Sequence, residues 1–271
     1  MNKLINTNLL GRSLMDRRLT LGIYCLGVAA YSLMIIAIWP SMQGNLDAME
    51  QLWQNYPEGL KAAFGADVSI SSFDGFLTLE YFSLMWVIIS APFAVSVATA
   101  AFAGDIEKGT MELLLSQPIP RWVISSSRMA YLNIGLLLII TATMLPVIIG
   151  APLVDAKLNM GGVLALGLQG FLLFLCIGAI GFLFSALTSD RGRAIFMVTG
   201  VLIVSYALDI LSQFSHAVDK LHFLSLFDYY DPYRYLHSAD IAWGDLAVLL
   251  GVAVVAFLAA TAIFQRRDIA V

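Results

Sequence analysis

The chain has 271 residues, of which 59% are hydrophobic and 13% are charged, and its mean hydropathy is +0.83. Soluble domains are about 45–50% apolar and about 25% charged, so this composition excludes an ordinary soluble domain and predicts a polytopic membrane protein. The formal net charge of −4 is small, and the placement of the charges along the chain is more informative than their sum.

Six stretches are long and apolar enough to span a membrane, because a spanning helix needs about 20 mostly apolar residues. A backbone in lipid must satisfy its own hydrogen bonds, so all six should be helices. We therefore expect an all-α polytopic fold and treat residues 1–271 as a single transmembrane domain. The expected spans cover residues 19–39, 79–103, 122–149, 161–187, 194–214 and 241–264.

Residues 1–18 precede the first expected span and contain four basic side chains. Leu10 and Leu14 share one face of a helix over this segment, and Arg17 and Arg18 can meet lipid phosphates. We expect an amphipathic helix lying on the membrane surface. The alternative is a short disordered tail.

The first long connection, residues 40–78, contains apolar side chains at helical spacing. These are Leu46, Met49, Leu52, Trp53 and Tyr56. They predict a short amphipathic helix at the outer interface of the membrane.

Small residues mark two of the expected spans. Ser96, Ala100 and Gly104 recur at intervals of four in the second, and the fourth is rich in glycine. Small residues let helices approach closely, so we expect tight packing within the bundle. Pro92, in the second span, is a candidate kink.

The stretch GDIEKGTMELLLSQPIPR separates the second and third spans. Gly109 permits a sharp change of backbone direction, and Thr110 is positioned to cap the short helix that follows. Glu112 suits the positive end of that helix, and Leu113–Leu115 offer apolar contacts to a groove on a partner. Pro118 should end the helix. The alternative is a plain loop whose charges only hold the topology.

Two features of the last spans concern ionisable residues. Asp209 lies within the fifth expected span, about one turn from its outer end; it is either solvated there or lines an internal path. The histidines all fall in the last outer loop, at His216, His222 and His237, but their spacing matches no metal-ligand pattern. We interpret them as interfacial polar residues and expect no metal.

Six spans place both termini on one side of the membrane. The side of the termini receives 11 basic residues and the other side receives four, Lys61, Lys157, Lys220 and Arg234. The positive-inside rule therefore predicts cytoplasmic termini, and it also places the stretch between the second and third spans in the cytoplasm.

Motifs of common enzymes are absent from the sequence: there is no zinc-binding HExxH, no GxSxG and no CxxC. Gly104 and Gly109 have the spacing of a phosphate-binding loop, but Thr110 and Met111 stand where such a loop needs lysine and serine or threonine. We expect no catalytic residue and no nucleotide site in this chain.

The cytoplasmic stretch resembles that of type-2 ATP-binding-cassette permeases, the exporter-type membrane subunits. Those proteins carry an acidic residue, Gly-Thr, a leucine-rich helix, proline and a basic residue between spans two and three. The matching positions here are Glu107, Gly109, Thr110, Glu112, Leu113, Leu114, Leu115, Pro118 and Arg121. The six-span plan fits the family as well.

The resemblance implies a coupling helix that docks on a separate ATPase subunit. It implies a working unit of two ATPase subunits, which hold the ATP and magnesium, and two permease subunits, identical or similar. We expect a multi-pass plasma-membrane exporter subunit for a hydrophobic or amphipathic substrate. The lipid membrane is a further expected partner, and no nucleic-acid partner is expected. The alternatives are an accessory or sensory membrane protein without transport, and an intramembrane enzyme.

Overall fold

The computed structural model describes residues 5–44, 51, 54–56, 71–212 and 220–268. This part of the chain contains helices and turns and no strand, which confirms the all-α polytopic fold. Five helices are long and apolar enough to cross a membrane, and a bent pair makes a sixth if it is counted as one span. The five are α2 (Arg18–Gln43), α9 (Arg121–Leu153), α10 (Met160–Leu187), α11 (Arg191–Ser212) and α14 (Trp243–Arg266).

The second span differs from the straight helix expected over residues 79–103. The short helix α5 (Phe73–Leu77) runs into the π-helical turn η1 (Thr78–Phe82), and α6 (Met85–Thr99) follows with a bend of 43°. Leu84, between them, has non-helical torsion angles of φ −134° and ψ −52°. A π-helical turn is one of the recognised causes of a sharp bend, whereas Pro92 lies inside α6 and away from the bend.

Helix α10 forms the centre of the bundle. It contacts α6, α9, α11 and α14, and 72% of its most apolar stretch of 18 residues is buried inside the bundle. Its glycines make these contacts close: a Cβ on Gly170 would lie 2.1 Å from the Trp86 ring, and a Cβ on Gly178 would lie 2.4 Å from Leu132. The prediction of tight packing around the glycine-rich span is confirmed.

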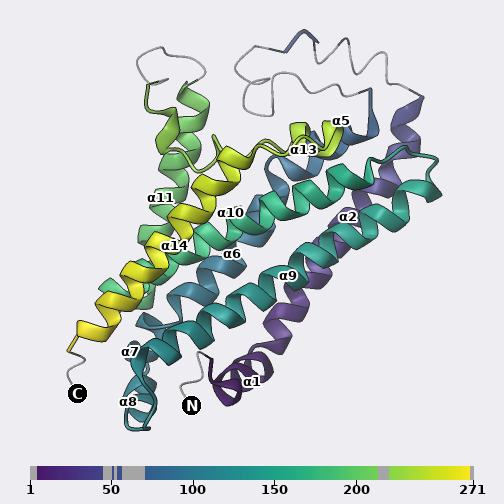
Figure 1. Cartoon of the computed structure of the whole chain (residues 1–271). Coiled ribbons are helices and arrows are strands. Elements are labelled where there is room, and N and C mark those ends of the chain that lie inside the picture. Colours follow the sequence, from purple (N-terminus) through teal and green to yellow (C-terminus); the bar gives the residue numbers. More distant parts are fainter. Residues whose placement is uncertain (1–4, 45–50, 52–53, 57–70, 213–219, 269–271) are drawn as a thin grey trace.

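One end of the bundle carries both termini and is called here the terminal end (Figure 1). It also carries α1 (Thr7–Asp16) and the two short helices α7 (Ala103–Glu107) and α8 (Thr110–Leu115). The opposite end, called the distal end, carries α5 and α13 (Pro232–Ser238).

Helix α1 is amphipathic and is packed against the bundle. The Asn6 side chain caps it, and the Asn6 backbone N–H donates to the Ser127 hydroxyl of α9 at 2.9 Å. Leu9, Leu10 and Leu14 pack against the apolar core. The helix expected near the N-terminus is therefore present over Thr7–Asp16, in place of a disordered tail.

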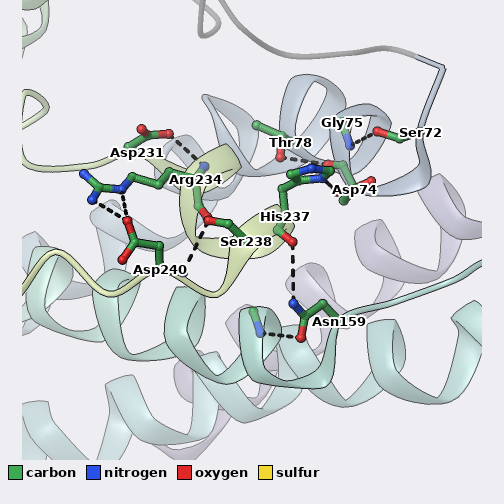
Figure 2. A network of polar contacts seen from close by, with 11 residues as sticks. Ser72, Asp74, Gly75, Thr78, Asn159, Asp231, Arg234, His237, Ser238 and Asp240 are labelled. Carbon is green, nitrogen blue, oxygen red and sulfur yellow. Dashed lines mark hydrogen bonds and ion pairs between the residues drawn. The ribbon is translucent and has the colours of Figure 1, made fainter.

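Figure 2 shows how polar contacts hold α13 at the distal end. The His237 ring pairs with the Asp74 carboxylate, which belongs to α5. Asn159 caps α10, and its side-chain amide donates to the His237 carbonyl at 3.5 Å. Three elements that are distant in the sequence are thus joined at one point.

The segment before α13 folds into the distal end of the bundle. Ser225 donates to the Ser205 carbonyl of α11 at 2.8 Å, and the Leu226 N–H donates to the Ser205 hydroxyl at 2.6 Å. The Tyr230 hydroxyl donates to the Phe82 carbonyl in η1 at 2.8 Å. This segment therefore connects α11 to the bent second span. The amphipathic helix expected around Leu46–Tyr56 lies largely outside the described residues.

Candidate coupling site

The stretch between α6 and α9 folds as α7, a turn at Gly109, and α8. Gly109 has φ 69° and ψ 4°, the left-handed conformation, and it precedes the first residue of α8. This conformation is unfavourable for a residue with a Cβ by about 1–2 kcal/mol. The sharp change of direction predicted at Gly109 is confirmed, and Pro118 lies in the connection that follows α8.

Helix α8 presents one face to the bundle and the other to its surroundings. Met111 is fully buried, and Leu114 and Leu115 are partly buried against the core. Glu112 is exposed, and Leu113 is 71% exposed. Of the three leucines expected to contact a partner, Leu113 is therefore the one that is largely free to do so.

Thr110 does not cap α8 as expected. It is the first residue of the helix, and no side chain caps the helix at Gly109. The Thr110 hydroxyl instead donates to the Asp105 carbonyl of α7 at 3.2 Å. The left-handed glycine turns the chain so sharply that the hydroxyl reaches back to the preceding helix.

Glu107 connects α7 to α11. Its carboxylate accepts a hydrogen bond from the backbone N–H of Arg191, the first residue of α11, at 2.8 Å. A carboxylate at a helix N-terminus satisfies an otherwise unpaired amide and interacts favourably with the helix dipole. Nearby, the Asp105 carboxylate pairs with Arg128 of α9. The candidate coupling segment is thus attached to two spans.

Arg121 binds carbonyl groups at the C-terminal end of α14. Its guanidinium donates to the carbonyl oxygens of Phe264 at 2.9 Å and Arg267 at 2.6 Å, at the C-terminal end of α14. Arg267 in turn donates to the carbonyls of Ala186 at 2.8 Å and Thr188 at 2.9 Å, at the end of α10. These two arginines link the ends of α9, α14 and α10 through carbonyl groups that would otherwise be unpaired.

A cleft of about 360 Å³ separates α8 from α1 and α9. Its walls combine Leu113 and Leu114 with charged side chains, namely Arg12, Asp16, Arg17, Asp105, Lys108 and Arg128. This cleft, with its charged and apolar walls, lies directly beside the exposed face of α8.

A larger groove of about 740 Å³ lies between α2, α6 and α11. Its lining is almost entirely apolar and includes Val87, Ala91 and Ile203. Tyr206 and Ile210 of α11 line the groove, but Asp209 does not. The carboxylate that the sequence offered as a candidate path-lining group therefore lies outside this groove.

Arg191, one of the 11 basic residues expected on the side of the termini, is a site residue that the sequence did not single out. It lines the terminal end of the groove, and its Nη2 donates to the Ser96 hydroxyl at 3.0 Å. A Cβ on Gly104 would lie 3.2 Å from the Arg191 Cδ. The small residues spaced by four in the second span thus make room for the long Arg191 side chain. That spacing is the feature of the sequence that could have indicated a close contact at this place.

Among the described residues, no group of three or more His, Cys, Asp or Glu side chains is placed to hold a metal ion. His222 pairs with Asp228 at 2.9 Å and His237 pairs with Asp74. His216 lies outside the described residues.

Comparison with known proteins adds one finding. The profile of a family described as ABC-2 family transporter protein matches residues 14–269, which include all the long helices and the segment of α7 and α8. No match is found among curated proteins.

Proposed function

The chain belongs to the ABC-2 family of transporter proteins, and from this membership we propose that it is the permease subunit of an ATP-driven exporter. As a member of this family with five apolar helices among its described residues, the chain is a multi-pass plasma-membrane protein and the permease of an ABC transporter. The proposal concerns its coupling to an ATPase, the direction of transport and the kind of substrate.

The observation that carries the proposal is the exposed face of α8, tethered to the spans. Glu112 and Leu113 are free to contact a partner, while Glu107 holds the N-terminus of α11 and Asp105 holds α9. A partner that moves α8 would therefore move both spans. Coupling requires this combination of an accessible surface and a firm connection to the transmembrane helices.

ATP hydrolysis takes place on a separate cytoplasmic polypeptide in this proposal. Two ATPase subunits, with ATP and magnesium, would act on two permease copies, identical or similar. The terminal end would face the cytoplasm, in line with the 11 basic residues expected there. The roles proposed for Gly109, Thr110, Pro118 and Arg121 are to shape and anchor the docking segment rather than to contact the ATPase.

The groove between α2, α6 and α11 would form the wall of the export path on each permease copy. Ligand sites are mostly apolar and have volumes of about 300–1,000 Å³, and the groove has about 740 Å³. This supports a hydrophobic or amphipathic substrate.

The proposal is tested by substitutions on the exposed face of α8. Glu112→Ala and Leu113→Asp should leave membrane insertion intact and reduce co-purification of the ATPase. A charge-assisted hydrogen bond contributes on the order of 1.5–3 kcal/mol, so its loss should weaken association roughly 10- to 150-fold. Substrate-linked ATPase activity should fall in parallel.

Leu153→Asp is the matched control, because Leu153 is 80% exposed and lies at the distal end of α9. It should leave ATPase association unchanged. Normal association and transport in both α8 variants would contradict the proposal. An ATPase that binds while no substrate moves would favour the accessory or sensory membrane protein instead.

A further inference from the structure

The groove between α2, α6 and α11 has one cation at its terminal end and apolar side chains along its length. Arg191 and Ile210 both line it, from the two ends of α11. They are separated by about 28 Å at 1.5 Å per residue, close to the roughly 30 Å of a hydrocarbon layer. Two lining side chains, Ile88 and Ile203, are 53% and 63% exposed, so the groove is open on one side.

The Arg191 guanidinium is only partly satisfied by the described part of the chain. Nη2 donates to the hydroxyl and, at 3.4 Å, to the carbonyl of Ser96. Nε is buried and has no acceptor there. None of the ion pairs between described residues includes Arg191. An arginine beside an apolar surface without a carboxylate partner is unfavourable.

The acidic residues at this end of α11 are already engaged elsewhere. Glu107 accepts from the backbone N–H of Arg191 at 2.8 Å, and Asp190 accepts from that of Arg193 at 2.9 Å. Both carboxylates therefore cap the helix rather than neutralise the guanidinium. An oxyanion from outside the chain would supply the missing partner, since arginine binds carboxylate and phosphate groups with strong, directed hydrogen bonds.

We propose that the groove binds an anionic lipid-like amphiphile from the membrane leaflet at the terminal end, with its phosphate or carboxylate headgroup on Arg191 and its apolar tail along α6 and α11. The apolar walls disfavour a small soluble anion. The described lining holds Arg191 and no acid, so it favours a lipid with net negative charge over a zwitterionic lipid, whose ammonium group would meet no carboxylate there. The role of this amphiphile as the transported substrate rests on the proposed function, whereas its binding in the groove does not.

The test uses the full chain in phosphatidylcholine vesicles, with its ATPase left in place where it co-purifies and with no ATP added. The probes are phosphatidylglycerol and phosphatidylcholine with the same diazirine-bearing tail, added as a small fraction. After illumination, mass spectrometry measures labelling of α6 and α11. The phosphatidylglycerol probe should label the groove about tenfold more than the phosphatidylcholine probe.

Arg191→Gln should abolish that preference, Arg191→Lys should retain part of it, and Ala207→Trp should block both probes by filling the groove. Arg193→Gln is the control, because the Arg193 side chain is 79% exposed and pairs with Asp190.

Equal labelling by the two probes, or a preference that survives Arg191→Gln, overturns the proposal. A further result would also overturn the proposal: neither probe labels the groove, and Ile203→Cys forms a disulfide between two copies of the chain. A second copy would then cover the site. Since the experiment involves no ATP hydrolysis, its failure leaves the proposed coupling function unaffected.

Discussion

At the scale of single residues, Gly109 has the most specific conformational requirement in the segment formed by α7 and α8, because it is left-handed with φ 69°. Apart from its chain neighbours, none of the described residues comes within 4 Å of the position that a Cβ would take there, so only the left-handed backbone opposes a substitution. Asparagine tolerates this conformation far better than a β-branched residue does. The effect of a side chain at this position is therefore set by the backbone alone.

Gly109→Val should strain the turn by at least about 1–2 kcal/mol and shift α8 out of its docking position. We expect reduced ATPase co-purification with an unchanged melting temperature of the transmembrane bundle in detergent. Gly109→Asn should behave nearly as the unaltered protein does. Equal loss in both variants would show that bulk at this position matters rather than backbone conformation.

The sequence predicts a short helix between the second and third spans, but it does not predict which distant helices the side chains of this segment contact. The resemblance names Glu107 and Arg121 as coupling residues, and the structure adds that they bind the backbone at the ends of α11 and α14. Their targets lie 84 and 143 positions away along the chain. A local motif carries no information on such distant helix ends, so these contacts follow only from the packing of the bundle.

At the scale of elements, the close packing of α10 depends on glycine at the positions where a neighbouring side chain fills the space. The Trp86 ring occupies the space beside Gly170, whereas in the described part of the chain no neighbouring group lies within 4 Å of the position that a Cβ would take on Gly251 in α14. The same substitution should therefore have opposite effects at these two positions.

Gly170→Ala should lower stability by about 1–3 kcal/mol, because an added methyl group in a filled core forces neighbours to move. Gly251→Ala should raise stability by about 0.5–1 kcal/mol through helix propensity. Thermal unfolding in detergent, followed with a thiol-reactive dye, compares the two. A rise in the melting temperature for Gly170→Ala would refute the described contact with Trp86.

Hydropathy predicted where the helices lie, but it could not predict the bend in the second span. The bend occurs where Tyr230, from a loop almost 150 positions later, donates to the carbonyl of Phe82. Trp86 also packs edge-on against Phe82 at 5.2 Å. The proline offered as a kink lies in a regular helix, because the tertiary contacts to η1 decide where the helix is interrupted.

At the scale of the whole molecule, the placement of basic residues predicts which end faces the cytoplasm. Single cysteines introduced at Gln117 and at Asp231 test this orientation. They are placed in a variant whose native cysteines, Cys25 and Cys176, are replaced by serine. Gln117 and Asp231 are exposed, and they lie near α8 and α13 respectively. An impermeant thiol reagent added to whole cells should modify the cysteine at 231 and spare the one at 117.

Permeabilised cells provide the control, because both cysteines should then react. The reverse pattern in intact cells would contradict the orientation and, with it, cytoplasmic docking of α8. Composition and hydropathy were sufficient to predict the membrane class. The groove was not predictable, because Val87 and Ile203 resemble any other apolar residues until α6 and α11 are placed beside each other.

The attachment of α1 has a consequence for the order of events during synthesis. Its anchor, the Asn6 amide, binds Ser127, which is made 121 residues later. At 5–20 residues per second, that interval is about 6–24 s. The leucines of α1 have no protein surface to cover them during this time, and the bilayer surface is the apolar phase available to an amphipathic helix. We therefore expect α1 to lie on the bilayer surface until Ser127 has been made, and to pack against the bundle afterwards.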